Sequence, residues 1–270
     1  MTKKKEQKIV VFTNLSPSDN MLILNGIKIA SMFKKELCLV YNYPKNKKKK
    51  HEQFKVILNS YVFPIKNEIP GLKVSTLLFS ERKTDLPEKL SDDYEAIFII
   101  ADADKFSKFS KVLFESPIPF LFVNSKSKIS SFNKIVLPID MRKECSDTAL
   151  WSSYFGRFSK AEIVVVAAND KGKQEQKQIA KNIVLTKKLF QKFNVKHKIY
   201  KGNKSSLRNV FEASKLAHIS SSDLFVILGS SNLTPLDWLI GLPERKIIKK
   251  AGDLPVLVIN SLRDNYILCD

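Results

Sequence analysis

The sequence has few of the residues that build disulfide frameworks, metal centres or membrane spans. Its three cysteines among 270 residues lie far apart with no C-x-x-C pair, which argues against disulfides and structural zinc. Its three histidines show no H-E-x-x-H or paired Cys/His spacing, so we expect no metal site. No apolar run reaches the length of a transmembrane helix, so we expect no membrane partner. The basic N-terminus lacks the apolar region of a secretory signal, which predicts a cytoplasmic location.

Acidic residues are scarce relative to basic ones, and the net charge is +19, from 46 Lys and Arg against 27 Asp and Glu. Residues 1–130 carry 23 basic and 14 acidic side chains, and residues 131–270 carry 23 and 13, so the excess is even. Five lysines at positions 45 and 47–50, here called the lysine cluster, form either a polyanion-binding loop or a solvated loop. No aromatic residues alternate with these lysines, so nucleic acid is not the expected partner.

The sequence repeats itself once. Four apolar segments recur in the same order with similar spacing, and chance explains this poorly. The matched pairs are 8–14 with 134–140, 39–42 with 165–168, 97–101 with 225–229, and 119–125 with 255–261. Duplication of a unit of about 130 residues, an ordinary domain size, is the better explanation. We therefore predict two units, residues 1–128 and 129–270.

Within each unit, short apolar runs alternate with stretches of helical periodicity. The runs are 4–6 residues long without polar alternation, as in parallel strands buried on both faces. In the first unit we expect a helix within residues 16–35, with Ser16 or Ser18 as its N-cap. In the second unit the equivalent helix should start at Ser146 or Asp147. This order predicts an α/β fold, a doubly wound parallel sheet of about five strands in each unit.

Two such tandem units, each opening with a strand that ends in Asp or Asn and closing with a proline-led apolar strand, resemble the universal stress protein family. The second unit is more similar: Val-Leu-Pro-Ile-Asp at 136–140 resembles the opening strand, and Ser146 matches the serine that opens the first helix. The resemblance implies two flavodoxin-like or adenine-nucleotide-alpha-hydrolase-like units that pair as an internal pseudo-dimer. It leaves open a further homodimer.

Residues 229–241 take the place of the family's phosphate loop. In ATP-binding members this loop follows G-x2-G-x9-G and then Ser or Thr, because glycines let the backbone approach phosphates and a helix N-terminus supplies N–H donors. Here Gly229 is present, but Asn232 replaces the second glycine. Eight residues separate Asn232 from Gly241, and Leu242 lacks the hydroxyl.

The resemblance implies that an adenine nucleotide, ATP or AMP, with Mg²⁺ in the case of ATP, binds at the carboxyl edge of the second sheet. Parallel α/β sheets place ligands at that edge. The candidate binding residues are Asp140, Ala167, Gly229, Ser230, Asn232 and Gly241.

The first unit departs further from the pattern. Asn14 replaces the strand-end aspartate and Ala101 the first glycine. No glycine lies between Ala101 and Pro119, and the loop is eight residues shorter than its counterpart, with 18 positions from Ala101 to Pro119 against 26 from Gly229 to Pro255. We expect no nucleotide binding in this unit.

Three functions are compatible with these features. The first is a stress-response regulator that binds an adenine nucleotide weakly through its second unit. The second is an interaction protein of the same fold that has lost nucleotide binding and contacts an unidentified protein partner. The third, which the charge alone supports, is nucleic-acid binding. No nucleophile, base or metal set can be assembled from spacing, so no catalytic residue is assigned and slow ATP hydrolysis is the most we expect.

Overall fold

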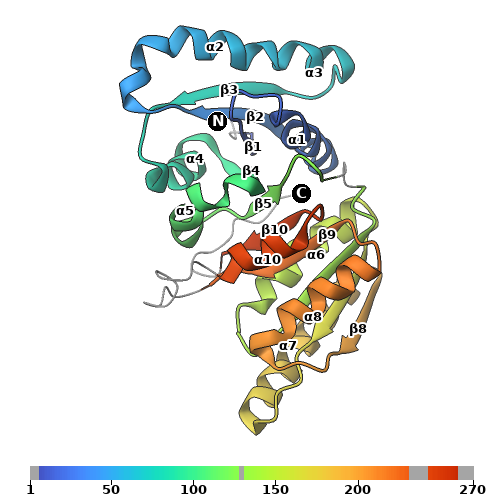
Figure 1. Ribbon diagram of the computed structural model, residues 1–270. Helices are drawn as coiled ribbons and strands as arrows, with labels where there is room; N and C mark the ends of the chain where they lie inside the picture. The colour runs from blue at the N-terminus through green and yellow to red at the C-terminus, as the bar shows by residue number, and fades with distance from the viewer. Residues whose placement is uncertain (1–5, 128–130, 231–242, 261–270) are drawn as a thin grey trace. The chain divides into compact units, whose positions relative to one another are not determined.

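The short apolar runs become parallel strands. The computed structural model describes residues 6–127, 131–230 and 243–260, and the chain divides into two compact units, one on each side of residues 129 and 130. Within the first unit the strand order is β3-β2-β1-β4-β5, and within the second it is β8-β7-β6-β9-β10. Among the described residues, the strand pairings within each unit are parallel. The predicted α/β fold with a doubly wound sheet in each unit is confirmed (Figure 1).

The first unit alternates strands with helices of unequal length. Its elements are β1 (Lys8–Phe12), α1 (Asp19–Phe33), β2 (Glu36–Asn42), the 3-10 helix η1 (Lys45–Lys50), α2 (His51–Ser60), α3 (Val62–Glu68), β3 (Val74–Phe79), η2 (Lys83–Asp85), α4 (Leu86–Tyr94), β4 (Ala96–Asp102), η3 (Ala103–Lys108), α5 (Ser110–Glu115) and β5 (Phe120–Val123). The segment between β4 and β5, which is eight residues shorter than its counterpart in the second unit, holds two short helices, η3 and α5.

The second unit has longer and more regular helices. Its elements are β6 (Lys134–Ile139), α6 (Cys145–Phe158), β7 (Glu162–Ala167), α7 (Lys173–Lys192), β8 (His197–Lys201), α8 (Ser206–Ile219), β9 (Leu224–Leu228), α10 (Pro243–Ala251) and β10 (Val256–Ile259). Helix α6 packs on α7, and α8 packs on α10. None of the helices described in either unit is long and apolar enough to cross a membrane.

Burial on both faces of the sheet explains why continuous apolar runs located the strands. Strands β4 and β9 are buried at every position, so no alternation could appear in the sequence. Of the two predicted helix starts, the first is confirmed, because Ser18 is the N-cap residue of α1, although its side chain makes no capping hydrogen bond. Helix α6 begins at Cys145 rather than at Ser146 or Asp147.

Helix α1 lies unusually close to its sheet at Gly26. A Cβ atom there would lie 2.5 Å from Cγ2 of Val11 and 3.0 Å from Cδ1 of Leu37, both on the underlying strands. A contact of 2.5 Å forces something to shift, and because the β-branched Val11 side chain has few rotamers, the shift falls on that side chain, the helix or the strand. Gly26 therefore sets the distance between α1 and the sheet.

We expect Gly26→Ala to destabilise the protein by about 1–2 kcal/mol, because overpacking outweighs the gain in helix propensity. Gly71→Ala is the matched control, since nothing lies within 4 Å of a Cβ at that exposed position. Urea unfolding followed by circular dichroism measures both. Equal midpoints for the two variants would contradict the close approach of α1.

Candidate functional site

The carboxyl ends of parallel strands meet at one edge of a sheet, and in the second unit four predicted site residues lie there. Asp140 follows β6, Ala167 ends β7, and Gly229 and Ser230 follow β9. The Gly229 N–H donates to the carbonyl oxygen of Ile259 at 2.8 Å, which ties this position to β10. The other two predicted residues, Asn232 and Gly241, lie outside the described residues, as does Leu242.

Arg142 connects Asp140 with Gly229. Its guanidinium donates to both carboxylate oxygens of Asp140, with Nη2 to Oδ2 at 2.6 Å and Nε to Oδ1 at 3.1 Å. Its Nη1 donates to the carbonyl oxygen of Gly229 at 3.1 Å. Asp140 is buried, and both its carboxylate oxygens already accept hydrogen bonds from this arginine. The carboxylate expected to lie near a nucleotide base is thus bound by the chain itself.

Glu244 makes the corresponding contact with Ser230. One carboxylate oxygen of Glu244 accepts the Ser230 backbone N–H at 2.6 Å and the Ser230 Oγ–H at 2.7 Å. These are the types of donor that a phosphate loop offers to a phosphate. Glu244 is buried, at 3% exposure, and its carboxylate occupies the Ser230 donors that an anionic ligand would need. A phosphate could use Ser230 only by displacing this carboxylate.

The remaining groups around Asp140 hold it rigidly. The Asn182 side-chain amide donates to the backbone carbonyls of Asp140 and Arg142, at 2.9 and 2.7 Å. The Cys145 thiol lies 3.4 Å from the Asp140 carboxylate. Burial, and then the negative charge of Asp140, raises the pKa of Cys145 far above its ordinary value, so this thiol stays protonated and unreactive.

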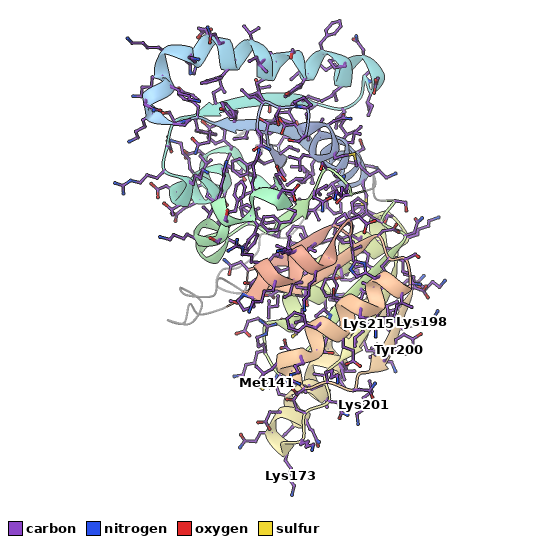
Figure 2. All side chains as sticks on the ribbon, in the orientation of Figure 1. Met141, Lys173, Lys198, Tyr200, Lys201 and Lys215 are labelled. Atoms are coloured by element: carbon purple, nitrogen blue, oxygen red, sulfur yellow. The ribbon has the colours of Figure 1, made fainter. Side chains whose placement is uncertain are left out.

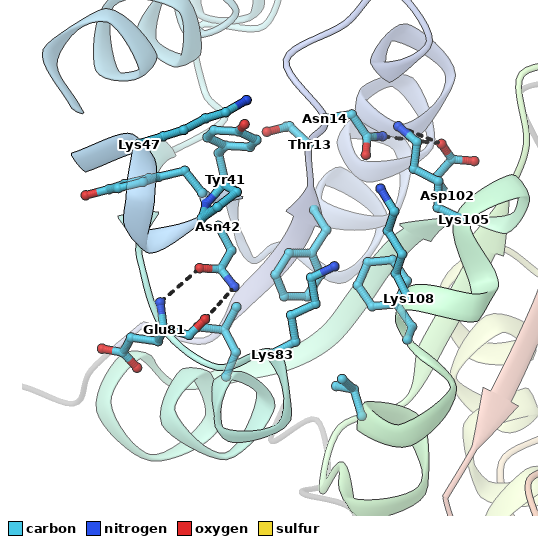
Figure 3. Close-up of a pocket in the computed structure, with 16 residues that line it drawn as sticks. Thr13, Asn14, Tyr41, Asn42, Lys47, Glu81, Lys83, Asp102, Lys105 and Lys108 are labelled. Atoms are coloured by element: carbon cyan, nitrogen blue, oxygen red, sulfur yellow. Dashed lines mark hydrogen bonds and ion pairs between the residues drawn. The ribbon is translucent and has the colours of Figure 1, made fainter. Parts of the chain in front are cut away.

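The equivalent edge of the first unit is hollow. A cavity of about 390 Å³ lies there, between the carboxyl ends of the strands and the short helices that follow them (Figure 3). Its lining comes from β1, β2, η1, β4, η3 and the segments beside them. The residues that line it are Phe12, Thr13, Asn14, Tyr41, Asn42, Tyr43, Pro44, Lys47, Glu81, Lys83, Leu86, Asp102, Lys105, Lys108, Phe109 and Val112.

Four lysines and two carboxylates line this cavity, an excess of two positive charges. Figure 3 shows Lys83 and Lys108 extending into the same space from different elements. Burial lowers the pKa of Lys83, and the positive charge of Lys108 lowers it further. The Lys83 ammonium also lies 5.9 Å from the ring centre of Phe109. An anion in the cavity would relieve the repulsion between these lysines.

Short polar contacts fix the floor of the cavity. The Asn14 backbone N–H donates to both carboxylate oxygens of Asp19 at 2.9 Å, and its side-chain amide donates to Asp102 at 3.3 Å. Lys105 lies 3.7 Å from the same Asp102 carboxylate. Asn14 stands where the resemblance leads us to expect an aspartate, and it joins two loops without adding a charge. Its donors are already taken by the Asp19 and Asp102 carboxylates, so the groups of this cavity that could bind an anion are the lysines.

Sequence reasoning missed this cavity because it looked for glycines. The three missed lysines share one simple property, which is that each follows a strand: Lys83 follows β3, and Lys105 and Lys108 follow β4. Listing every charged residue that follows a strand would have gathered them at one edge. Their origin in two separated loops hides them from any local motif.

A second hollow, of about 290 Å³, lies in the other unit between β8 and α8. Lys198, Tyr200 and Lys201 project from β8 in this region (Figure 2). The Lys198 ammonium is already paired with the Glu162 carboxylate at 2.9 Å. No group of three or more His, Cys, Asp or Glu that could hold a metal ion occurs among the residues the structure describes.

Comparison with solved structures identifies the fold. A universal stress protein from Archaeoglobus fulgidus DSM 4304 is similar over 95% of this chain and 97% of its own, with a TM-score of 0.71 at 11% identity. A universal stress protein in complex with cAMP covers 49% of this chain and 99% of its own, with a TM-score of 0.37 and 14% identity. No protein-family model and no curated protein matches the sequence. The chain has the fold of the universal stress proteins, as the resemblance predicted.

We expect Glu244→Ala to destabilise the protein by roughly 1–3 kcal/mol, because the Ser230 N–H loses its buried acceptor. Ser230→Ala removes only the hydroxyl and keeps the backbone contact, so its loss should be smaller. Thermal unfolding of both variants gives the comparison. A Glu244→Ala protein as stable as the natural one would show that this carboxylate does not hold the edge together.

Proposed function

We propose that this protein is a universal-stress-protein-like regulator that binds a small phosphate-bearing ligand in the lysine-lined cavity of its first unit. The observation that carries the proposal is the position of Lys83, Lys105 and Lys108 around one cavity at the carboxyl ends of the strands. Doubly wound sheets bind ligands at the point where the strand order reverses. Here that point lies between β1 and β4, which both contribute to the lining.

Lysines can replace a glycine-rich loop as a phosphate site. A glycine loop recognises phosphate with backbone N–H groups, whereas an ammonium acts as a point charge on a flexible stem. The two kinds of site need different sequences, so the missing loop of the first unit does not rule out an anion there. The volume of about 390 Å³ suits a small ligand.

Aromatic side chains give the cavity a second chemical character. Phe12, Tyr41, Tyr43 and Phe109 belong to the lining, so a ligand with an apolar or planar part would contact them. A phosphate-bearing ligand with a planar base combines both features. ATP and AMP are therefore the ligands to test first, with Mg²⁺ alongside ATP. Adenosine, which lacks phosphate, is the matched control.

The second unit supports nucleotide binding less well. Its Asp140 is paired with Arg142 and its Ser230 with Glu244, so a nucleotide would have to displace groups of the chain. The site at Asp140, Ala167, Gly229, Ser230, Asn232 and Gly241 stays a prediction. So do the pairing of the two units and the cytoplasmic location.

We expect ATP or AMP to raise the melting temperature, and Lys83→Met with Lys108→Gln to abolish that rise. A ligand at 100 times Kd stabilises by about 2.7 kcal/mol, or a few degrees at this size. Without ligand the double variant should melt no lower than the natural protein, because ionised Lys83 is disfavoured in the folded state. Lys173→Met, at an exposed position on α7, is the control that should keep the ligand shift.

The same assay decides between the two units. A shift that survives loss of the two cavity lysines but disappears in Asp140→Ala would place the ligand in the second unit and overturn the proposal. No shift with any phosphate compound would support the interaction protein that has lost nucleotide binding.

Glu244→Ala, added to the double cavity variant, tests whether the Glu244 carboxylate alone closes the second unit. We expect pyrophosphate to stabilise this triple variant and not the double variant, because Ser230 regains free donors. A triple variant that does not respond to pyrophosphate would show that removing Glu244 is not sufficient to create an anion site. Differential scanning fluorimetry measures each case.

A further inference from the structure

Helices α2 and α3 run end to end along β3, and their orientation is fixed by the side they bury (Figure 1). Leu58 and Ile65 are buried against the sheet. The Phe54 ring lies 5.1 Å from Tyr41 and 5.4 Å from Tyr43, measured between ring centres. The opposite side of the two helices therefore faces solvent.

That solvent-facing side carries large apolar side chains. Val56 is 68% exposed, Ile57 41% and Phe63 70%. A single exposed apolar residue is ordinary on a protein surface. Val56 and Phe63 lie opposite the buried side and Ile57 lies at its margin, and three such side chains within eight consecutive positions indicate a surface that is covered in some functional state.

The same segment is strongly basic. Residues 45–68 contain seven lysines, namely the lysine cluster with Lys55 and Lys66, against Glu52 and Glu68, a net charge of 7 − 2 = +5. All seven lysines are exposed, and none forms an ion pair within the described part of the chain. The cluster lies in η1, directly before α2. We call residues 45–68 the α2–α3 surface.

We propose that the α2–α3 surface docks the protein on an anionic lipid bilayer. Clusters of lysines on an amphipathic helix attract anionic headgroups, and exposed apolar side chains beside them enter the boundary with the acyl chains. A nucleic acid would use the lysines but not the aliphatic Val56 and Ile57. The sequence led us to expect no membrane partner because no segment spans a bilayer, but a surface helix needs no span.

The test is co-sedimentation of the full chain with vesicles of phosphatidylserine and phosphatidylcholine, compared with pure phosphatidylcholine. We expect binding only to the anionic vesicles. Replacing Lys48, Lys49 and Lys50 with Gln should weaken it about a hundredfold, at about fivefold per lysine. The matched control replaces Lys173, Lys177 and Lys181, exposed on α7, and removes the same charge. It should change the affinity little.

A second pair of variants tests the apolar part. Val56→Ser with Phe63→Ser should weaken vesicle binding about tenfold. Leu207→Ser, at an 84% exposed position on α8, should not. All these side chains are exposed, so the melting temperature should hold and loss of folding would not explain the result.

Two results would overturn the proposal. If both lysine triples weaken binding equally, the attraction reflects only the net charge of +19. If the Val56→Ser and Phe63→Ser protein binds vesicles normally, while an RNA oligomer binds the natural protein and not the Lys48–50 variant, the surface recognises nucleic acid. These variants leave the cavity residues Lys83 and Lys108 unchanged, so this test and the ligand assay fail independently.

Discussion

The structure depends on the parallel arrangement of its strands. A parallel strand must be followed by a crossover, and the crossovers cover both faces of the sheet with helices. A small-molecule site on the sheet is therefore confined to the loops at the strand ends. Within each unit the carboxyl ends of the strands meet at one edge, so residues as distant as Asn14 and Asp102 come within hydrogen-bond distance. The same covering of the sheet by helices makes the distance between α1 and the strands matter, and Gly26 sets that distance.

The two units meet this constraint in different ways. In the second unit the edge is neutralised internally, by Arg142 on Asp140 and by Glu244 on Ser230. In the first unit the edge remains hollow and holds an excess of lysines. Since the strand order is the same, the difference comes from the loops alone. A glycine motif and a lysine-lined cavity are alternative ways to present positive potential to an anion, and only the first leaves a local pattern in the sequence.

The sequence predicted the strands well because their burial is local and continuous. Short apolar runs such as residues 97–101, separated from one another by segments of helical periodicity, are typical of the buried strands of a parallel sheet. Of the helix starts, Ser18 is the N-cap residue of α1 as predicted, although its side chain makes no capping hydrogen bond, and α6 begins one residue before Ser146. The cavity could not be predicted from a motif, because Lys83 and Lys108 approach each other only through the strand order. The pairing of Arg142 with Asp140 was not predicted either, because the resemblance assigned that aspartate to a nucleotide base instead of to a side chain of the protein.

The difference in charge between the strand-end edges of the two units bears on how readily each unit is cleaved by proteases. The second unit satisfies its own edge, whereas the first retains repulsion between Lys83 and Lys108. Segments with weak internal contacts open first, and proteases cleave such openings. The loops that carry these lysines, η2 and η3, are short and lie at that edge. Under the proposed function, an anion bound between these lysines would relieve their repulsion, so the first unit should resist proteolysis better with the ligand than without it.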